Sequence, residues 1–245
     1  MTNKGLPDFE QLYINARRLE ERVYDDEAVS EFPDIAREHI HFKEWSMRKG
    51  SAERLLKYIE KTFTAPEILE IGCGNGWLSN KLAGIHKSKV SGIDINKTEL
   101  EQARRVFGAN KSLTFLYGPL EDIFPEDRIF DVIVLAAAIQ YFENLPTLLN
   151  KLQQKLSKQG EIHIIDSPFY NKEDQVSARE RTALYYSKLG FKEMSGYYHH
   201  HTFESLIPYQ PQYLYRGKKI QLLIKKVFFS VYDSPFPWIR IKKML

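Results

Sequence analysis

Short apolar runs alternate with amphipathic stretches through the middle of the chain. The runs are EILEI (67–71), KVSGID (89–94), LTFLY (113–117), FDVIVL (130–135) and EIHIID (161–166). Most of the stretches between them have helical spacing, so that the pattern is one of repeated strand–helix–strand units. Such units build an α/β fold with a doubly wound, mostly parallel sheet that helices cover on both faces.

Helical spacing continues on either side of this region. Before it, residues 8–24 and a stretch from about residue 41 to residue 62 place apolar side chains on one helix face. After it, a charged helix is predicted at about 172–189, and an aromatic-rich segment without clear period follows. The final segment, PFPWIRIKK (235–243), alternates like an edge strand with its prolines at the start.

The helix after the second run has clear start and stop signals. Asn96 is a good N-cap, and Glu99 stands three residues later, where it can reach back to complete a capping box. Gly108 then ends the pattern. The sequence therefore predicts a helix between the second and third strands.

The first run ends in a glycine loop, in the sequence EILEIGCGNGWLS. A phosphate-binding loop needs a lysine and a hydroxyl after its last glycine, but Trp77 and Leu78 follow Gly76. A dinucleotide-binding loop has glycine at its first, third and sixth positions; Gly72 and Gly74 supply the first two, and Trp77 takes the sixth. The phosphate loop is excluded, and the dinucleotide interpretation is weakened.

Two acids near the loop separate the remaining ligands. Asp94 ends the second run, where a carboxylate can accept both hydroxyls of a ribose. Glu70 comes two residues before the first glycine; a carboxylate there repels a pyrophosphate and attracts an ammonium or a sulfonium. S-adenosylmethionine carries both cations and no phosphate. Glycines in the loop would let the backbone approach its methionine arm.

Four segments of the chain resemble, in their order, the motifs of class I S-adenosylmethionine-dependent methyltransferases. They are EILEIGCGNGWLS, VSGIDIN, LYGPLEDI and FDVIVLAAAIQYF. The resemblance covers about residues 66 to 166 and implies a Rossmann-like, seven-stranded sheet whose last strand is antiparallel, a place that PFPWIRIKK can fill. It implies that the glycine loop backs the methionine part of the donor, that Asp94 holds the ribose, and that the fourth strand ends beside the methyl. The residues that it assigns to donor binding are Glu70, Gly72, Cys73, Gly74, Gly76, Asp94, Ile95, Leu120, Glu121 and Ala136. Pro119 departs from the family, which often has an aspartate there to bind the adenine amino group.

Two clusters offer groups for catalysis. The first precedes the core, where the family often folds a helical lid over the donor; we predict this lid over residues 1–64 and the core over residues 65–245. In it, His39 or His41 can act as a base, and Trp45 can face the sulfonium. The alternative is an amphipathic helix with Trp45 in the core. In the second cluster, AIQYF, Gln140 and Tyr141 can face the acceptor, or Tyr141 and Phe142 can pack against the next helix.

Composition and charge restrict the remaining possibilities. The single cysteine, Cys73, excludes an internal disulfide, and neither a signal peptide nor a membrane span is predicted, so we expect a cytoplasmic globular protein. The net charge is only +3, although the tail is basic from Tyr213 onward. That tail is read as a solvated lysine face rather than a nucleic-acid or membrane surface. Three adjacent histidines, 199–201, lack metal-ligand spacing, so no metal site is predicted.

The sequence therefore predicts transfer of a methyl group from S-adenosylmethionine to a small-molecule acceptor. An RNA or protein methyltransferase with the same donor is the first alternative. A non-catalytic module that binds an S-adenosyl ligand or a nucleotide is the second, and an NAD-linked oxidoreductase is more distant. The acceptor, the methylated atom and the oligomeric state cannot be read from these residues.

Overall fold

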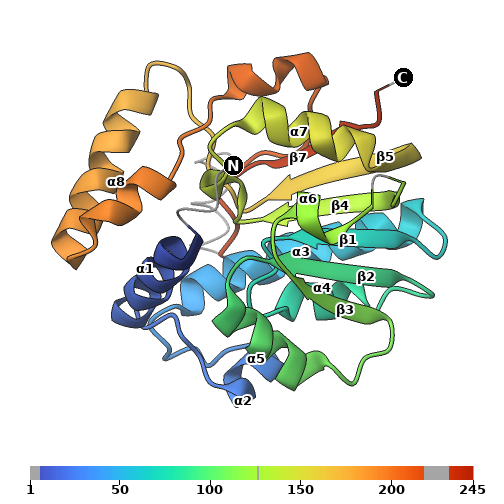
Figure 1. Cartoon of the computed structure of the whole chain (residues 1–245), viewed down its shortest axis with the longest axis horizontal. Coiled ribbons are helices and arrows are strands. Elements are labelled where there is room, and N and C mark those ends of the chain that lie inside the picture. Colours follow the sequence, from blue (N-terminus) through green and yellow to red (C-terminus); the bar gives the residue numbers. More distant parts are fainter. Residues whose placement is uncertain (1–5, 126, 218–231, 245) are drawn as a thin grey trace.

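In the computed structural model, which describes residues 6–125, 127–217 and 232–244, a single sheet runs through the centre of the chain (Figure 1). Its strands are β1 (Glu67–Ile71), β2 (Lys89–Asp94), β3 (Leu113–Tyr117), β4 (Phe130–Ala136), β5 (Leu156–Ile165), β6 (Gln212–Tyr215) and β7 (Trp238–Lys242). The order across the sheet is β3-β2-β1-β4-β5-β7-β6. The first five strands are parallel, so the predicted Rossmann-like, seven-stranded sheet is confirmed.

The C-terminal strand was predicted at the edge of the sheet, but it lies inside the sheet. β7 pairs antiparallel with β5 on one side and with β6 on the other. The edge strand is β6, which lies in the aromatic-rich segment where no strand was predicted. β6 alternates between exposed and half-buried positions, whereas Ile239 and Ile241 of β7 are fully buried. A strand with this much apolar area belongs in the interior.

Helices cover both faces of the sheet, as predicted. They are α1 (Leu6–Leu19), α2 (Asp26–Glu31), α3 (Phe42–Thr62), α4 (Trp77–Leu82), α5 (Lys97–Phe107), α6 (Leu120–Ile123), α7 (Leu145–Gln154) and α8 (Gln175–Leu189), with 3-10 helices η1 (Ile139–Tyr141), η2 (Lys192–Tyr197) and η3 (Phe203–Tyr209). One core cluster contains residues of α2, α3, α4 and α5 packed on one face of the sheet. Another contains residues of α6, α7 and η3 packed on the other face. None of the helices in the described ranges is long and apolar enough to cross a membrane.

The N-terminal helices pack in two different ways. Leu55 and Ile59 of α3 are fully buried in the same cluster as Ile68 of β1, so α3 is a layer of the core. α1 lies against α8 and η2 at the left of Figure 1, where Phe9 and Tyr186 belong to a separate cluster. That cluster also holds residues that follow β2 and β4, so α1 covers the carboxyl ends of the strands. The division of the chain at residue 64 stays a prediction.

The basic tail is engaged within the molecule wherever the structure describes it. The Arg240 guanidinium lies 3.3 Å from the buried Glu161 carboxylate, and Arg216 stacks over the Tyr213 ring. Lys243 donates a hydrogen bond to the Gln153 carbonyl. Other basic residues of the tail, among them Lys218, Lys219, Lys225 and Lys226, lie outside the described residues.

Candidate functional site

The glycine loop between β1 and α4 is a tight turn held against the end of β2. The backbone N–H groups of Gly72 and Cys73 both donate to the Ile93 carbonyl, at 2.9 and 3.1 Å. Gly74 has φ +51° and Gly76 has φ +77°, values that L side chains rarely adopt. The positive φ angles therefore favour glycine at these positions of the turn.

Asp94 at the end of β2 fixes this loop. One carboxylate oxygen accepts a hydrogen bond from the Gly74 N–H at 2.7 Å, and the other accepts from the Asn96 N–H at 2.7 Å. Burial raises the pKa of Asp94, while these backbone hydrogen bonds lower it. Asp94 therefore joins the loop to the start of α5 and remains half-exposed beside both.

The start of α5 differs from the prediction in one respect. Asn96 is the N-cap, and its side chain accepts from the Glu99 N–H at 3.1 Å, as predicted. Glu99 does not reach back, because the Asn96 N–H is already bonded to Asp94. Instead its carboxylate points toward the glycine loop, 3.3 Å from where a Cβ on Gly74 would lie. Glu99 is thus a candidate site residue that the sequence analysis missed, because its spacing from Asn96 indicated a capping role.

Two of the acids at the loop hold their protons more firmly than usual. Glu70 is buried and accepts a 2.5 Å hydrogen bond from the Ser79 hydroxyl. Burial raises the pKa of Glu70 to about 8, with a further contribution from the Asp94 charge. Burial and the same charge raise the pKa of Glu99 to about 7. The sheet side of the site is thus a cluster of three acids that a ligand cation would stabilise.

A cavity of about 90 Å³ lies at this cluster. Its sheet side is formed by Glu70, Gly72, Cys73, Gly74, Asn75, Trp77, Glu99, Ala136 and Ala137. Its other side comes from the N-terminal region: Tyr13, Arg17, Arg22, Tyr24, Glu44, Trp45 and Arg48. The N-terminal helices therefore border the cavity opposite the glycine loop, and they bring cations to face the acids. Their function as a lid stays a prediction.

The cations of the lid form an unbroken chain of ion pairs. Glu20 lies 3.1 Å from Arg17 and 3.4 Å from Arg22, while Glu44 pairs with Arg22 and, at 3.0 Å, with Arg48. Although Glu44 is largely buried, which opposes ionisation, the two arginines lower its pKa to about 2. Three guanidinium groups share two carboxylates, so this group of ion pairs has a net positive charge.

A larger cavity of about 490 Å³ continues from the first and shares Ala137 and the three lid arginines with it. Several tyrosines line it, among them Tyr141, Tyr170, Tyr185 and Tyr198. Tyr141, a predicted catalytic residue, packs edge-on against Tyr13 at 5.6 Å while also lining this cavity. Tyr141 therefore packs against α1 rather than against the next helix along the chain. Its role toward the acceptor stays a prediction.

The structure brings only some of the residues predicted for donor binding to the first cavity. Those that line it are Glu70, Gly72, Cys73, Gly74, Ala136 and Trp45. The other residues predicted for donor binding, which do not line it, are Gly76, Asp94, Ile95, Leu120 and Glu121. Leu120 is buried in the core, Ile95 packs under α1, and Glu121 pairs with Lys151 of α7.

Trp45 lies in the core, as the alternative interpretation of its segment predicted, and its contact with the sulfonium stays a prediction. Its ring stacks on Phe32 with 3.7 Å between centroids, and its indole N–H donates to the Tyr24 hydroxyl at 3.0 Å. It is buried and yet borders the first cavity, with the Arg48 guanidinium over its face.

The two histidines predicted as bases line neither of these cavities. The His41 imidazole is hydrogen-bonded to the Glu20 carbonyl at 2.8 Å, and the His39 imidazole accepts from the His41 N–H at 3.0 Å. They join the turn before α3 to the end of α1. Their role in proton transfer stays a prediction.

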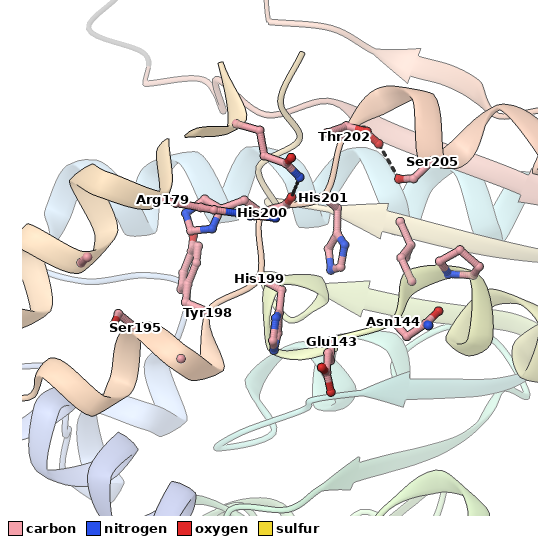
Figure 2. Close-up of a pocket in the computed structure, with 15 residues that line it drawn as sticks. Glu143, Asn144, Arg179, Ser195, Tyr198, His199, His200, His201, Thr202 and Ser205 are labelled. Carbon is pink, nitrogen blue, oxygen red and sulfur yellow. Dashed lines mark hydrogen bonds between the residues drawn. The ribbon is translucent and has the colours of Figure 1, made fainter. Parts of the chain in front are cut away.

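The adjacent histidines 199–201 border a third, open cavity of about 570 Å³ between α7 and α8 (Figure 2). Their side chains point in different directions: His200 bonds to the Thr182 hydroxyl of α8 at 2.8 Å, and His201 bonds to the Ile139 carbonyl at 3.1 Å. Burial lowers the pKa of His200 to about 4. Among the described residues, no group of three or more acids, histidines or cysteines could hold a metal ion.

Comparison with known proteins agrees with this geometry. Residues 68–160 match a family described as "Methyltransferase domain". The malonyl-[acyl-carrier protein] O-methyltransferase of Priestia megaterium is 29% identical over 47% of this chain and 43% of its own length. That of Calditerrivibrio nitroreducens is 34% identical over 46% of this chain and 44% of its own. The chain thus spans less than half the length of these curated relatives.

A solved structure extends the likeness in fold to nearly the whole chain. The plantazolicin methyltransferase BpumL, in complex with SAH, is 18% identical, covers 98% of both chains and has a TM-score of 0.55. At this identity the likeness concerns the fold. The family match and the sheet order together confirm that the region around the glycine loop is a class I methyltransferase domain.

Proposed function

We propose that this chain, which carries a class I methyltransferase domain, transfers a methyl group from S-adenosylmethionine to a small-molecule acceptor. The observation that carries the proposal is the division of charge across the first cavity. Glu70 and Glu99 face it from the sheet, and the lid arginines face it from the other side. The methionine end of the donor carries two cations and one carboxylate, which this arrangement complements.

The residues of the site fit the donor in chemistry, and the lid decides when there is room for it. Glu70 and Glu99 would lie near the ammonium and sulfonium, Asp94 near the ribose, and a lid arginine near the carboxylate. Ligand sites of this kind typically measure about 300–1,000 Å³, so the cavity of about 90 Å³ corresponds to a closed lid. We infer that α1 moves to admit the donor and closes afterwards. When bound, the donor supplies a methyl group on a positively charged sulfur.

The larger cavity is the proposed acceptor site. Its volume of about 490 Å³ suits a small molecule, and its tyrosines suit an acceptor with an apolar or aromatic body. Ala137, after the end of β4, belongs to both cavities and marks the place where donor and acceptor would meet. The names of the relatives mention two different compounds, malonyl-[acyl-carrier protein] and plantazolicin, so they do not indicate which acceptor this chain uses.

Calorimetry and turnover together test the proposal. S-adenosylhomocysteine should bind the purified chain with a stoichiometry of one, and a small-molecule extract of cells should convert added S-adenosylmethionine to S-adenosylhomocysteine. Absence of binding would refute the proposal, as would tighter binding of NADH. Binding without turnover would favour the alternative of a non-catalytic module.

Donor binding should also release protons. Because burial raises the pKa of Glu70 to about 8 and that of Glu99 to about 7, Glu70 is mostly protonated and Glu99 partly protonated at neutral pH in the free protein. A bound cation lowers both pKa values, so affinity should rise with pH, by up to about tenfold per unit and group, and level off above about pH 8. Calorimetry in two buffers of different ionisation heat measures the proton count. Glu99→Gln should reduce it, and equal heats in both buffers would contradict the linkage.

A further inference from the structure

We propose that Asp166 accepts the proton of the methyl acceptor, and that the acceptor is therefore an amine or a hydroxyl compound rather than a carboxylate. This inference rests on the proposed function and adds to it the class of acceptor. It depends on the position of Asp166, on the partners of its carboxylate and on a second unpartnered acceptor atom nearby.

Asp166 lies where the donor cavity opens into the acceptor cavity. In the parallel pairing of β4 with β5, Ala136 is opposite Ile165, so Ala137 and Asp166 are the next residues on adjacent strands. The Ala137 N–H donates to the Ile165 carbonyl at 3.0 Å, which keeps the two strand ends together. Ala137 borders both cavities, and Asp166 borders the acceptor cavity.

Both of these residues have a strained backbone. Ala137 has φ +52° and Asp166 has φ +50°, in the left-handed region that residues other than glycine seldom occupy. Strain of this kind costs about 1–3 kcal/mol per residue and clusters at active sites. Here it turns the chain sharply at the two strand ends that border the acceptor cavity.

The Asp166 carboxylate is held by one oxygen only. Oδ1 accepts from the Ser51 hydroxyl at 2.7 Å and from the Ser234 hydroxyl at 2.9 Å. Within the described ranges, Oδ2 has no hydrogen bond and the carboxylate has no ion pair. The basic groups that face it are engaged elsewhere: Arg48 pairs with Glu44, and Arg54 pairs with Asp233 at 2.7 Å.

The titratable groups around Asp166 set its proton affinity. Burial raises its pKa, against the opposing effects of Arg48, the two serine hydroxyls and Arg54. Tyr215 of β6 and Asp233 also face this place. A carboxyl group with a raised pKa, hydrogen-bonded on one side and open on the other, is suited to general base catalysis.

The other acids of the acceptor cavity are poor bases. Glu44 lies between two arginines that lower its pKa to about 2, and Glu20 pairs with Arg17 and Arg22. Among the described acids of the acceptor cavity, Asp166 is the one outside the ion-pair chain.

Gln140 adds a second hydrogen-bond acceptor to the same cavity. The side chain is 6% exposed, and its Nε2 donates to the Ala137 carbonyl at 2.6 Å. Its Oε1 is buried and has no hydrogen-bond partner among the described residues. A buried acceptor without a partner is costly, by about 1–3 kcal/mol, and a ligand N–H or O–H would remove that cost. An ionised carboxylate offers no such hydrogen.

The reaction balances with these groups. The nucleophilic nitrogen or oxygen forms a bond to the methyl carbon, the carbon–sulfur bond of the donor breaks, and its electron pair stays on sulfur as the neutral thioether. The proton of the nucleophile passes to Oδ2 of Asp166 and leaves to solvent after product release. Gln140 orients the nucleophile by accepting a hydrogen bond from it.

The test compares the wild type with Asp166→Asn in the full chain. The substrates are radiolabelled donor and a panel of small amines, phenols and alcohols, each paired with the matching carboxylic acid. We expect N–H or O–H compounds to be methylated and carboxylates to stay unmodified. The variant should lose turnover about 100-fold, keep its affinity for S-adenosylhomocysteine and lose the rise of rate with pH. A titration of the Asp166 carboxyl by ¹³C NMR should give a pKa above that of an ordinary aspartate.

Ser51→Ala serves as the matched control, because it removes one hydrogen bond and keeps the carboxylate. The rise of rate should persist in this variant and move to higher pH, a shift that a purely structural role would not produce. Methylation of carboxylates alone, an unchanged pH profile in Asp166→Asn, or an ordinary carboxyl pKa would overturn the inference. Failure of the wild type to bind S-adenosylhomocysteine would instead refute the proposed function.

Discussion

Replacing Asp94 with asparagine is expected to weaken binding of S-adenosylhomocysteine about 100-fold. Both carboxylate oxygens of Asp94 accept backbone N–H groups, from Gly74 and from Asn96. Asparagine keeps one acceptor oxygen and places an NH₂ group against the other N–H. Hydrogen bonds to a charged group contribute about 1.5–3 kcal/mol each, and about 2.8 kcal/mol corresponds to a factor of 100. The loss would come from the disturbed loop and from the ribose contact proposed for this carboxylate.

Calorimetry of the purified variant checks this result, and a thermal unfolding curve shows whether the fold is kept. Asp26→Asn is the matched control, because it makes the same chemical change at an exposed carboxylate that pairs with Arg105. Its affinity should match the wild type. If Asp94→Asn bound within about threefold of the wild type, Asp94 would not be a donor-binding residue.

Gly76→Ala is expected to have the largest effect on stability. Gly76 has φ +77°, and an added Cβ would lie 2.5 Å from the Phe115 ring and 2.9 Å from the Ala103 methyl group. The left-handed conformation costs an L residue about 1–2 kcal/mol, and overpacking adds about 1–3 kcal/mol. For a chain of this size, that should lower the unfolding temperature on the order of 10 °C.

Gly196→Ala separates this effect from the general cost of adding a methyl group. No atom lies within 4 Å of the Cβ that Gly196 would gain. Its unfolding temperature should therefore stay close to that of the wild type. If both variants melted together, the loop at Gly76 would be looser than its contacts imply.

The sheet was readable from the sequence because its strands are buried. β1, β2 and β3 begin and end at the residues that the apolar runs predicted. In β1, four of the five residues are buried, as the continuous apolar sequence of an inner strand requires. β5 begins at Leu156, before its apolar run. Leu156 pairs with Phe130 of β4, and the next residues of β5 are partly or fully exposed, so polar side chains are tolerated there. The half-exposed β6 carried no such signal, and β7 was mistaken for the edge strand.

Side-chain roles were less readable, because several partners compete for one group. Glu99 has the spacing of a capping residue, but Asp94 takes the N–H that it would have capped. Glu121 follows the third strand, where the resemblance places an adenine contact, and its carboxylate pairs with Lys151 of α7. The adenine contact of Glu121 stays a prediction. Such choices depend on elements that are distant in sequence.

The sequence by itself determined the parallel sheet, the glycine loop and the acids at the ends of β1 and β2, because local conformation and periodic burial are written in neighbouring residues. Only the tertiary structure decided that Arg17, Arg22 and Arg48 face those acids and that Glu20 and Glu44 neutralise most of their charge. It also decided that Asp166 borders the larger cavity outside the ion pairs of the described residues. Coulomb interactions and burial depend on distance in space, and the side chains on or next to α1, α3 and β5 approach one another only after folding.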